Sequence, residues 1–308
     1  MEAINKSQLN CDIDTGVCEV PQTTPLSNNS IIQKPVKLLY FTDPICSSCW
    51  GIEPQLRKLK QEYGQYFDMD YRMGGLLKSW DEYGGSDVNG PISVAKHWDD
   101  AGKYYQMPID GDIWLTDPLP SSYLPSMAFK AAQLQGNEKA HQFLRRMKEM
   151  VFTEKINIAR KENLLSAAKD IDLDLQRFES DLQQPAKQLF EEDLALARAK
   201  DVRGFPTIFF IDNNNNQFKV YGSKPYELYE SALLKLIEGP VVKNATNVLT
   251  DILKHYPTVT LREFEVFFNL STEEALLALN KMVAENQLMK SETKAGPIWK
   301  EVNLFNHS

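Results

Sequence analysis

Apolar residues follow two different periods along the chain. Residues 36–41 are apolar and rich in strand formers, and residues 67–73 alternate apolar with polar positions before Gly74-Gly75. Between these two runs, apolar side chains recur at the spacing of a helix, at Ile52, Leu56, Leu59 and Tyr63. The order strand, helix, strand predicts an α/β fold with a buried, parallel pair of strands.

The following segment, about 76–200, has helical patterns and no convincing strand. Apolar positions recur at helical spacing across 125–151, a further helix is expected at 162–169, and residues 191–200 are rich in Ala and Leu. Asp174 is typical of a residue that caps the start of a helix. The segment is therefore predicted to be a large all-α insertion that forms a lid or wall beside the sheet.

The β pattern returns after this insertion. Residues 204–211 are dense in strand formers and contain Pro206 near their start, and residues 218–221 follow a polar turn as a hairpin partner. A helix is expected at 226–238, and Gly239-Pro240 ends it. These elements complete the predicted α/β sheet.

Residues 241–308 have the pattern of a separate small domain. Three short helices precede a hairpin between 288 and 300, and Thr260 and Ser271 are typical caps for the second and third helices. This order predicts a winged-helix-like domain, a shape often used on DNA. Seven basic residues stand against eight acidic ones there, which favours a protein contact over DNA. The chain thus divides into a polar tail (1–30), an α/β domain (31–240) and this C-terminal domain.

The composition is that of an ordinary globular protein, with 43% apolar and 25% charged residues. A net charge of −8 argues against binding to a nucleic-acid backbone, which attracts clustered Lys and Arg. The chain has no apolar stretch near the length of a membrane span, and its first thirty residues are too polar for a secretory signal. We therefore expect a cytoplasmic protein without a membrane contact.

The four cysteines form two close pairs. Cys46 and Cys49 lie where the first strand meets the following helix, and free N–H groups there favour a thiolate, with pKa values of roughly 3.5–7.5. This predicts that Cys46 attacks a disulfide and that Cys49, one turn deeper, resolves the mixed disulfide. Cys11 and Cys18 flank Asp and Gly residues that suit a tight loop. A disulfide, a second redox pair and two separate thiols all stay open for them.

Half of a zinc site is the main alternative for the Cys46 pair. The remaining ligands would have to come from Cys11, Cys18 and the four histidines, His97, His141, His255 and His307. None of these forms the usual second close-spaced ligand pair. No metal is therefore predicted.

Three motifs stand in the chain in a fixed order. They are Asp43-Pro44 with Cys46-Ser47 and Cys49-Trp50-Gly51, then Met73-Gly74-Gly75-Leu76, then Gly204-Phe205-Pro206-Thr207. With these motifs, the chain resembles the DsbA branch of the thioredoxin superfamily over about 36–238. More narrowly, it is similar to the cytoplasmic predicted protein-disulfide isomerases of that branch, which are related to FrnE-type enzymes. The resemblance implies a thioredoxin fold to which the C-terminal domain is an addition.

The resemblance also implies a role for each motif residue. Cys46 attacks, Cys49 resolves, and Pro206 is a cis-proline that faces the dithiol. The main chain of Phe205 binds an extended substrate strand, and Trp50 either shapes the substrate site or simply packs. No cofactor is implied, because electrons are exchanged with a cellular thiol pool or reductase.

The predicted function is a thiol-disulfide oxidoreductase or isomerase that acts on protein or low-molecular-weight disulfides. Ser48 departs from the family, where an aromatic residue is expected, and leaves the direction of electron flow open. The alternative is a DsbA-like adaptor that binds a client protein for proteolysis or regulation, with the C-terminal domain as a contact. A third hypothesis is a glutathione-dependent isomerase or transferase. The intact pair of Cys46 and Cys49 argues against it.

Overall fold

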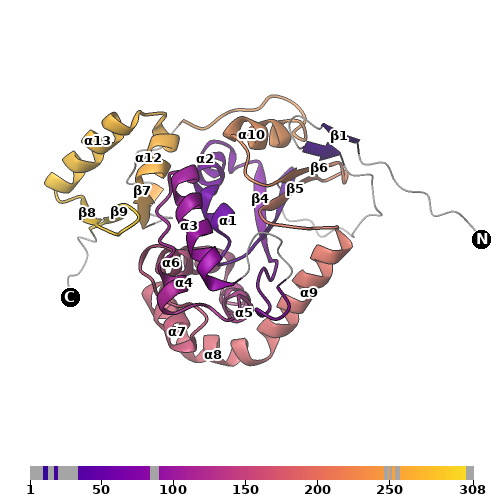
Figure 1. Cartoon of the computed structure of the whole chain (residues 1–308). Coiled ribbons are helices and arrows are strands. Elements are labelled where there is room, and N and C mark those ends of the chain that lie inside the picture. The colour runs from indigo at the N-terminus through magenta and orange to yellow at the C-terminus, as the bar shows by residue number, and fades with distance from the viewer. Residues whose placement is uncertain are drawn as a thin grey trace, which may run out of the picture.

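A six-stranded sheet forms the centre of the molecule (Figure 1). The computed structural model describes residues 10–12, 17–19, 34–83, 90–245, 249, 252–253 and 257–302. The strands of this sheet are β1 (Asn10–Asp12), β2 (Val17–Glu19), β3 (Val36–Thr42), β4 (Phe67–Met73), β5 (Thr207–Asp212) and β6 (Gln217–Tyr221). Their order is β1-β2-β6-β5-β3-β4, and only β3 and β4 pair in parallel. The predicted strands of the α/β domain are confirmed.

Helices cover both faces of the sheet. α1 (Ser47–Gly51) and α2 (Glu53–Tyr63) connect β3 to β4, and α10 (Tyr226–Leu234) follows β6. α2 and α10 pack on one face, while the other face meets the end of helix α9 (Pro185–Ala199). β3 is buried at every position except Lys37, because both of its faces are covered. This double burial explains why its sequence is an almost unbroken apolar run.

The segment between β4 and β5 is all-α among its described residues, as predicted. Its helices are α3 (Pro91–Tyr105), α4 (Ile113–Thr116), α5 (Tyr123–Gln133), α6 (Asn137–Thr153), α7 (Lys161–Asp170), α8 (Leu175–Gln183) and α9 (Pro185–Ala199). Asp174 caps α8 by accepting the Arg177 N–H at 3.0 Å. The sequence pattern gives no separate helix for 91–105, yet α3 is one of the longest helices here.

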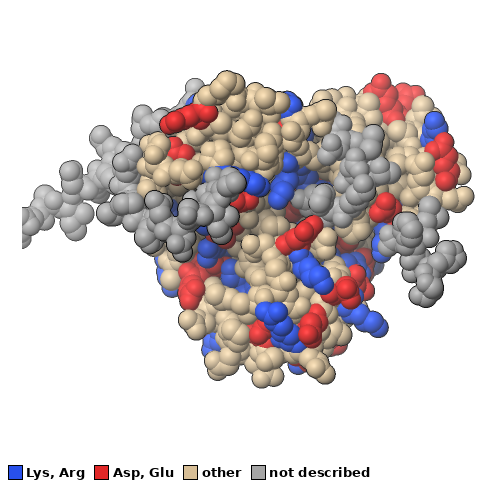
Figure 2. Space-filling model, turned by 180° about the vertical axis from the view of Figure 1, so that it is seen from behind, with Lys and Arg blue, Asp and Glu red and all other residues tan. Residues whose placement is uncertain are grey.

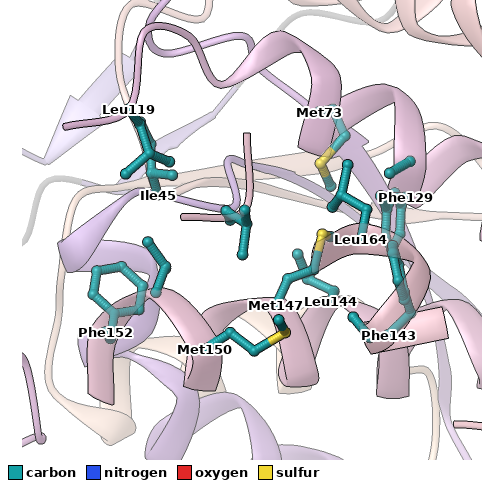
Figure 3. Close-up of a cluster of buried hydrophobic side chains, with 14 of the residues drawn as sticks. Ile45, Met73, Leu119, Phe129, Phe143, Leu144, Met147, Met150, Phe152 and Leu164 are labelled. Carbon is teal, nitrogen blue, oxygen red and sulfur yellow. The ribbon is translucent and has the colours of Figure 1, made fainter. Parts of the chain in front are cut away.

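The core of this insertion extends to the dithiol. Figure 3 shows Phe143, Leu144, Met147, Met150 and Phe152 of α6 on one side of the cluster and Ile45, Met73 and Leu119 on the other. Ile45 directly precedes Cys46 in the chain. The packing of the insertion therefore holds the chain just before α1 in place.

The C-terminal domain has the predicted winged-helix-like pattern in its described part. Its elements are β7 (Thr258–Thr260), α12 (Leu261–Phe268), α13 (Thr272–Ala284), β8 (Leu288–Ser291) and β9 (Ile298–Glu301), with the sheet order β7-β9-β8. Thr260 and Ser271 cap their helices as predicted, and the structure shows that each forms a capping box. The short strand β7 is an addition to the prediction. The boundary at residue 240 stays a prediction.

The N-terminal tail also differs from the expectation of a merely polar segment. β1 pairs with β2, and β2 pairs with β6 at the edge of the central sheet. In this register Cys11 stands directly opposite Cys18. Three strand spacings, about 14 Å, separate β2 from β3, so this pair lies well away from Cys46.

Candidate functional site

The two thiols of the Cys46 pair lie at the start of α1. Cys46 is the N-cap residue of α1, and its Sγ accepts the N–H of Cys49 at 3.2 Å. Both cysteines are free thiols and both are buried, with 5% of Cys46 and none of Cys49 exposed. The structure thus brings the predicted pair together at a helix start, but it leaves very little thiol surface open to a substrate.

Burial also changes the acidity of this pair. Burial raises the pKa of the Cys46 thiol, and the neighbouring Cys49 adds to that effect. Burial opposes ionisation of Cys49 as well, but the hydrogen bond from Cys46 and the charge of Lys148 outweigh it and lower the pKa of Cys49. The role of Cys46 as the attacking thiol and of Cys49 as the resolving thiol stays a prediction. The helix start alone does not offset the loss of solvent.

The peptide bond between Phe205 and Pro206 is cis and faces this pair, which is the geometry that the resemblance implies. The Cys46 thiol donates to the carbonyl oxygen of Phe205 at an S···O distance of 3.7 Å. Gly74 leaves room for the Phe205 ring, because a Cβ on this glycine would lie 1.9 Å from the ring. The second and third sequence motifs therefore meet at Cys46. The catalytic role of Pro206 stays a prediction.

The side chain of Asp43 links three parts of the chain. Its carboxylate accepts the N–H of Ile45 at 3.1 Å, the N–H of Leu76 at 2.7 Å and the hydroxyl of Ser122 at 2.8 Å. The side chain is fully buried, and burial raises its pKa to about 6. Asp43 thus fixes the loop before α1 against the Gly74-Gly75 motif and the start of α5.

Trp50 belongs to the core, and this corrects its predicted place among the substrate-binding residues. The side chain has no exposed surface, its Nε1 donates to the Pro108 oxygen at 2.9 Å, and its ring stacks on Phe152. A residue enclosed in this way cannot contact a substrate. Of the two predicted substrate contacts, only Phe205 reaches a cavity.

A cavity of about 350 Å³ opens beside Cys46 and is lined largely by aromatic side chains. These include Trp80, Trp98, Trp114, His97 and Phe205. The hydroxyl of Ser47 lies 3.5 Å from Nε2 of His97, and Ser48 accepts the Tyr105 hydroxyl at 3.0 Å. Sequence reasoning missed this aromatic lining. Its signal was the density of Trp and Tyr between residues 80 and 114, which periodicity alone assigns to a core.

A second buried polar cluster joins the C-terminal domain to the rest of the molecule. Glu263 of α12 accepts from Arg57 of α2 at 2.6 Å and from both terminal nitrogens of Arg145 of α6, at 2.7 and 3.1 Å. Arg145 also donates to Glu149 at 2.6 Å. We call these four residues the interdomain clamp. At most 7% of any of their side chains is exposed.

The charges of the clamp balance one another. Burial opposes ionisation of Glu263, but the charges of Arg145 and Arg57 outweigh it and lower the pKa of this carboxyl to about 2. The guanidinium of Arg145 also lies over the Trp50 ring, at 4.4 Å from the ring centre. Trp50 directly follows Cys49 in α1. The helix that carries the dithiol therefore contacts the side chain that anchors the C-terminal domain.

Within the described ranges, no group of three or more His, Cys, Asp or Glu side chains is placed to hold a metal ion. Nor is any described helix long and apolar enough to cross a bilayer. Acidic and basic side chains are intermixed on the face of the molecule in Figure 2.

Comparison with known proteins supports the fold and corrects the predicted function. The family model "Thioredoxin" matches residues 39–231. A cytosolic disulfide reductase, DsbM of Pseudomonas aeruginosa, has a similar structure (TM-score 0.53, 21% identity), covering 65% of this chain and all of that one. At this identity the likeness shows a shared fold and no shared activity.

Sequence relatives match a much larger part of the chain. The chain is 34% identical to the ClpXP adapter protein SpxH of Halalkalibacterium halodurans, over 97% of this chain and 99% of that one. It is 31% identical to SpxH of Bacillus subtilis, over 89% and 92% of the two chains. Both relatives are named adapter proteins, and the match extends over both domains of this chain. The prediction of an oxidoreductase or isomerase is therefore wrong, and the alternative, an adaptor that binds a client protein, is favoured. The predicted resemblance to DsbA-type proteins is confirmed for the fold, and the chain belongs to the thioredoxin family.

Proposed function

We propose that this protein is an adapter that binds a client protein and presents it to the ClpXP protease. The observation that carries the proposal is the share of this chain that each kind of similar protein covers. The disulfide reductase covers 65% of the chain, whereas the SpxH adapters cover 89% to 97% of it. The adapter name is thus attached to proteins that match both the thioredoxin fold and the C-terminal domain.

Two features of the structure support this proposal. Both thiols are buried, with 5% of Cys46 and none of Cys49 exposed, so little sulfur is open to a disulfide substrate. The interdomain clamp fixes the C-terminal domain against α2 and α6, so the two domains offer one continuous surface. An adapter needs such a surface to hold two proteins together, and it needs no thiol chemistry. We expect it to act in the cytoplasm.

The proposal is tested by protein half-lives in the producing cells. Pulse-labelling followed by mass spectrometry compares cells with the chain, cells without it, and cells with the double variant Cys46→Ser/Cys49→Ser. We expect a small set of proteins to live longer without the chain, and the double variant to restore their rapid turnover. In cells that lack active ClpXP, the presence of the chain is expected to make no difference.

Two outcomes contradict the proposal. In the first, no protein changes its half-life when the chain is removed. In the second, the wild-type chain restores turnover and the double serine variant does not. That result would mean that the function requires the thiols.

A further inference from the structure

The second pair of cysteines lies on the N-terminal hairpin, which consists of β1 and β2. Each of these strands is three residues long, and β2 pairs with β6 at the edge of the central sheet. Cys11 stands directly opposite Cys18 within the hairpin, and Cys18 stands opposite Lys219 of β6. Directly opposed residues lie on the same face of a sheet, so the register places the two cysteines next to each other.

The hydrogen bonds between β5 and β6 show which way the main chain of β6 faces. The N–H of Gly222, just after β6, donates to the oxygen of Pro206 at 2.9 Å. At the turn before β6, the N–H of Asp212 donates to the oxygen of Asn216 at 3.0 Å. Hydrogen-bonded and non-hydrogen-bonded pairs alternate in an antiparallel ladder, so the even-numbered residues of β6 bond to β5. The main-chain groups of Lys219 therefore face β2.

The same alternation identifies the kind of pair that the cysteines form. Cys18 is opposite Lys219, so these two form a hydrogen-bonded pair, and the main-chain groups of Cys18 face β6. Cys18 and Cys11 are then a non-hydrogen-bonded pair. The Cα atoms of such pairs are about 4.5 Å apart, within the usual range for a disulfide of about 4.4–6.8 Å. Because this spacing is at the short end of the range, a disulfide here should be readily reduced.

Positive side chains gather on the face of the sheet that carries the two cysteines. Lys219 lies on this face together with Phe209, its partner in β5. The ammonium groups of Lys200 and Lys219 lie 4.9 and 5.5 Å from the centre of the Phe209 ring. The nearby carboxylate of Asp201 is paired with Arg203 at 2.9 Å. Since positive charge favours a thiolate, we expect the cysteine opposite Lys219 to react first.

We propose that Cys11 and Cys18 form a reversible disulfide, produced by a low-molecular-weight disulfide such as oxidised glutathione, which holds the N-terminal hairpin on the edge of β6. The Cys18 thiolate attacks the small disulfide, forms a mixed disulfide and releases one small thiol. The Cys11 thiolate then attacks the Cys18 sulfur and releases the second. The two cysteine thiols lose two electrons and two protons, which the small disulfide gains as it becomes two thiols.

The bond would strengthen a weak part of the sheet. A hairpin with strands as short as β1 and β2 is marginally stable on its own and depends on its pairing with β6. A covalent link between the two strands reduces the freedom of the detached hairpin and so favours the paired state. The oxidised hairpin is expected to keep the edge of β6 covered, whereas the reduced hairpin can leave it and expose an unpaired strand edge.

The first test uses the full-length chain with Cys46→Ser/Cys49→Ser, which retains only the two cysteines of the hairpin. The chain is equilibrated with oxidised and reduced glutathione, blocked with N-ethylmaleimide and mapped by mass spectrometry. A register control adds Cys18→Ser and Val17→Cys to this chain. Val17 lies on the other face of the hairpin from Cys11, so the control keeps two thiols but separates them.

We expect the Cys11–Cys18 bond to form within one chain and to reopen in excess reduced glutathione. The effective concentration of the two thiols should be at least about tenfold higher than in the register control. Mixed glutathione disulfides in place of the bond, or a control that closes as readily, would overturn the proposal. A bond that withstands excess reduced glutathione would overturn its reversibility.

Hydrogen exchange measured by NMR tests the effect on β6 separately. The N–H of Lys219 faces β2, whereas the N–H of Val220 faces β5 and serves as the internal control. We expect oxidation to slow exchange at Lys219 about tenfold and to leave Val220 unchanged. Equal exchange at Lys219 in both redox states contradicts the proposed cover of β6. Failure of the adapter proposal would appear elsewhere, as unchanged half-lives in cells.

Discussion

The dithiol site and the interdomain clamp are both buried polar clusters, yet their carboxyl groups behave in opposite ways. Asp43 accepts hydrogen bonds from two N–H groups and a hydroxyl, and burial raises its pKa to about 6. Glu263 is just as buried, but two arginines hold its pKa at about 2. At Asp43 the neutral donors do not offset the loss of solvent, whereas at Glu263 the charged arginines do. The dithiol site should therefore respond to pH near neutrality, and the clamp should not.

The largest effect is expected from Glu263→Gln. It leaves Arg57 and Arg145 buried with one negative charge fewer, which should lower the free energy of unfolding by about 3–5 kcal/mol. Urea unfolding followed by circular dichroism measures the change. Glu273→Gln on the exposed side of α13 is the control and should change stability by less than about 0.5 kcal/mol. Equal effects of the two substitutions would contradict the role of the clamp.

A smaller effect is expected from the titration of Asp43. Its pKa is raised in the folded state, so between pH 3.8 and about 6 the folded chain holds more protons than the unfolded chain. Stability should therefore fall as pH rises through this window, by about 3 kcal/mol in total. His141 has a pKa lowered to about 4 by burial and acts in the opposite sense. The difference between wild type and Asp43→Asn isolates the contribution of Asp43, and parallel pH profiles would disprove it.

Replacing Arg145 and Glu263 together should lower the free energy of unfolding by less than the sum of the two single effects. Arg145→Met and Glu263→Met each leave a charge without its partner, whereas the double variant leaves the cluster neutral, with Arg57 and Glu149. We expect the double variant to be more stable than the sum of the single effects by about 1–3 kcal/mol. A double-mutant cycle in urea measures this coupling. Strict additivity would mean that the two side chains act independently.

The smallest effect concerns the reactivity of Cys46. Because burial raises its pKa, its alkylation by iodoacetamide at pH 7 should be at least about tenfold slower than that of a free cysteine. The rate should rise steeply with pH, and unfolding in urea should remove the difference. Peptide mapping by mass spectrometry follows the modified residue. Fast alkylation of the folded chain at pH 7 would restore Cys46 as an active thiol.

The sequence was sufficient for elements that depend on local pattern. The apolar run of β3, the cap residue Asp174 and the capping boxes at Thr260 and Ser271 all depend on neighbours within a few positions. The three motifs also met in space as the resemblance implied. Local pattern and the order of the family motifs can both be identified without knowledge of the packing.

Features that depend on distant partners could not be predicted. Glu263 is the fourth residue of a capping box, and nothing nearby shows that Arg57 and Arg145 also bind it. The raised pKa of Cys46 follows from burial by the insertion, which its position at a helix start does not reveal. Trp50 looked equally suited to a surface and to a core. For Glu263 and Trp50 the deciding contacts lie more than fifty residues away in the chain.

Glu263 has two tasks at once, since it also accepts the N–H of Thr260 at 2.8 Å and so completes the first turn of its own helix. A protein engineer who transplanted this C-terminal segment onto another carrier would have to move both arginines with it. Otherwise the graft would arrive with a starting turn whose acidic cap has lost its counter-ions. The C-terminal domain and the rest of the chain are thus structurally interdependent, and they cannot be exchanged as independent modules.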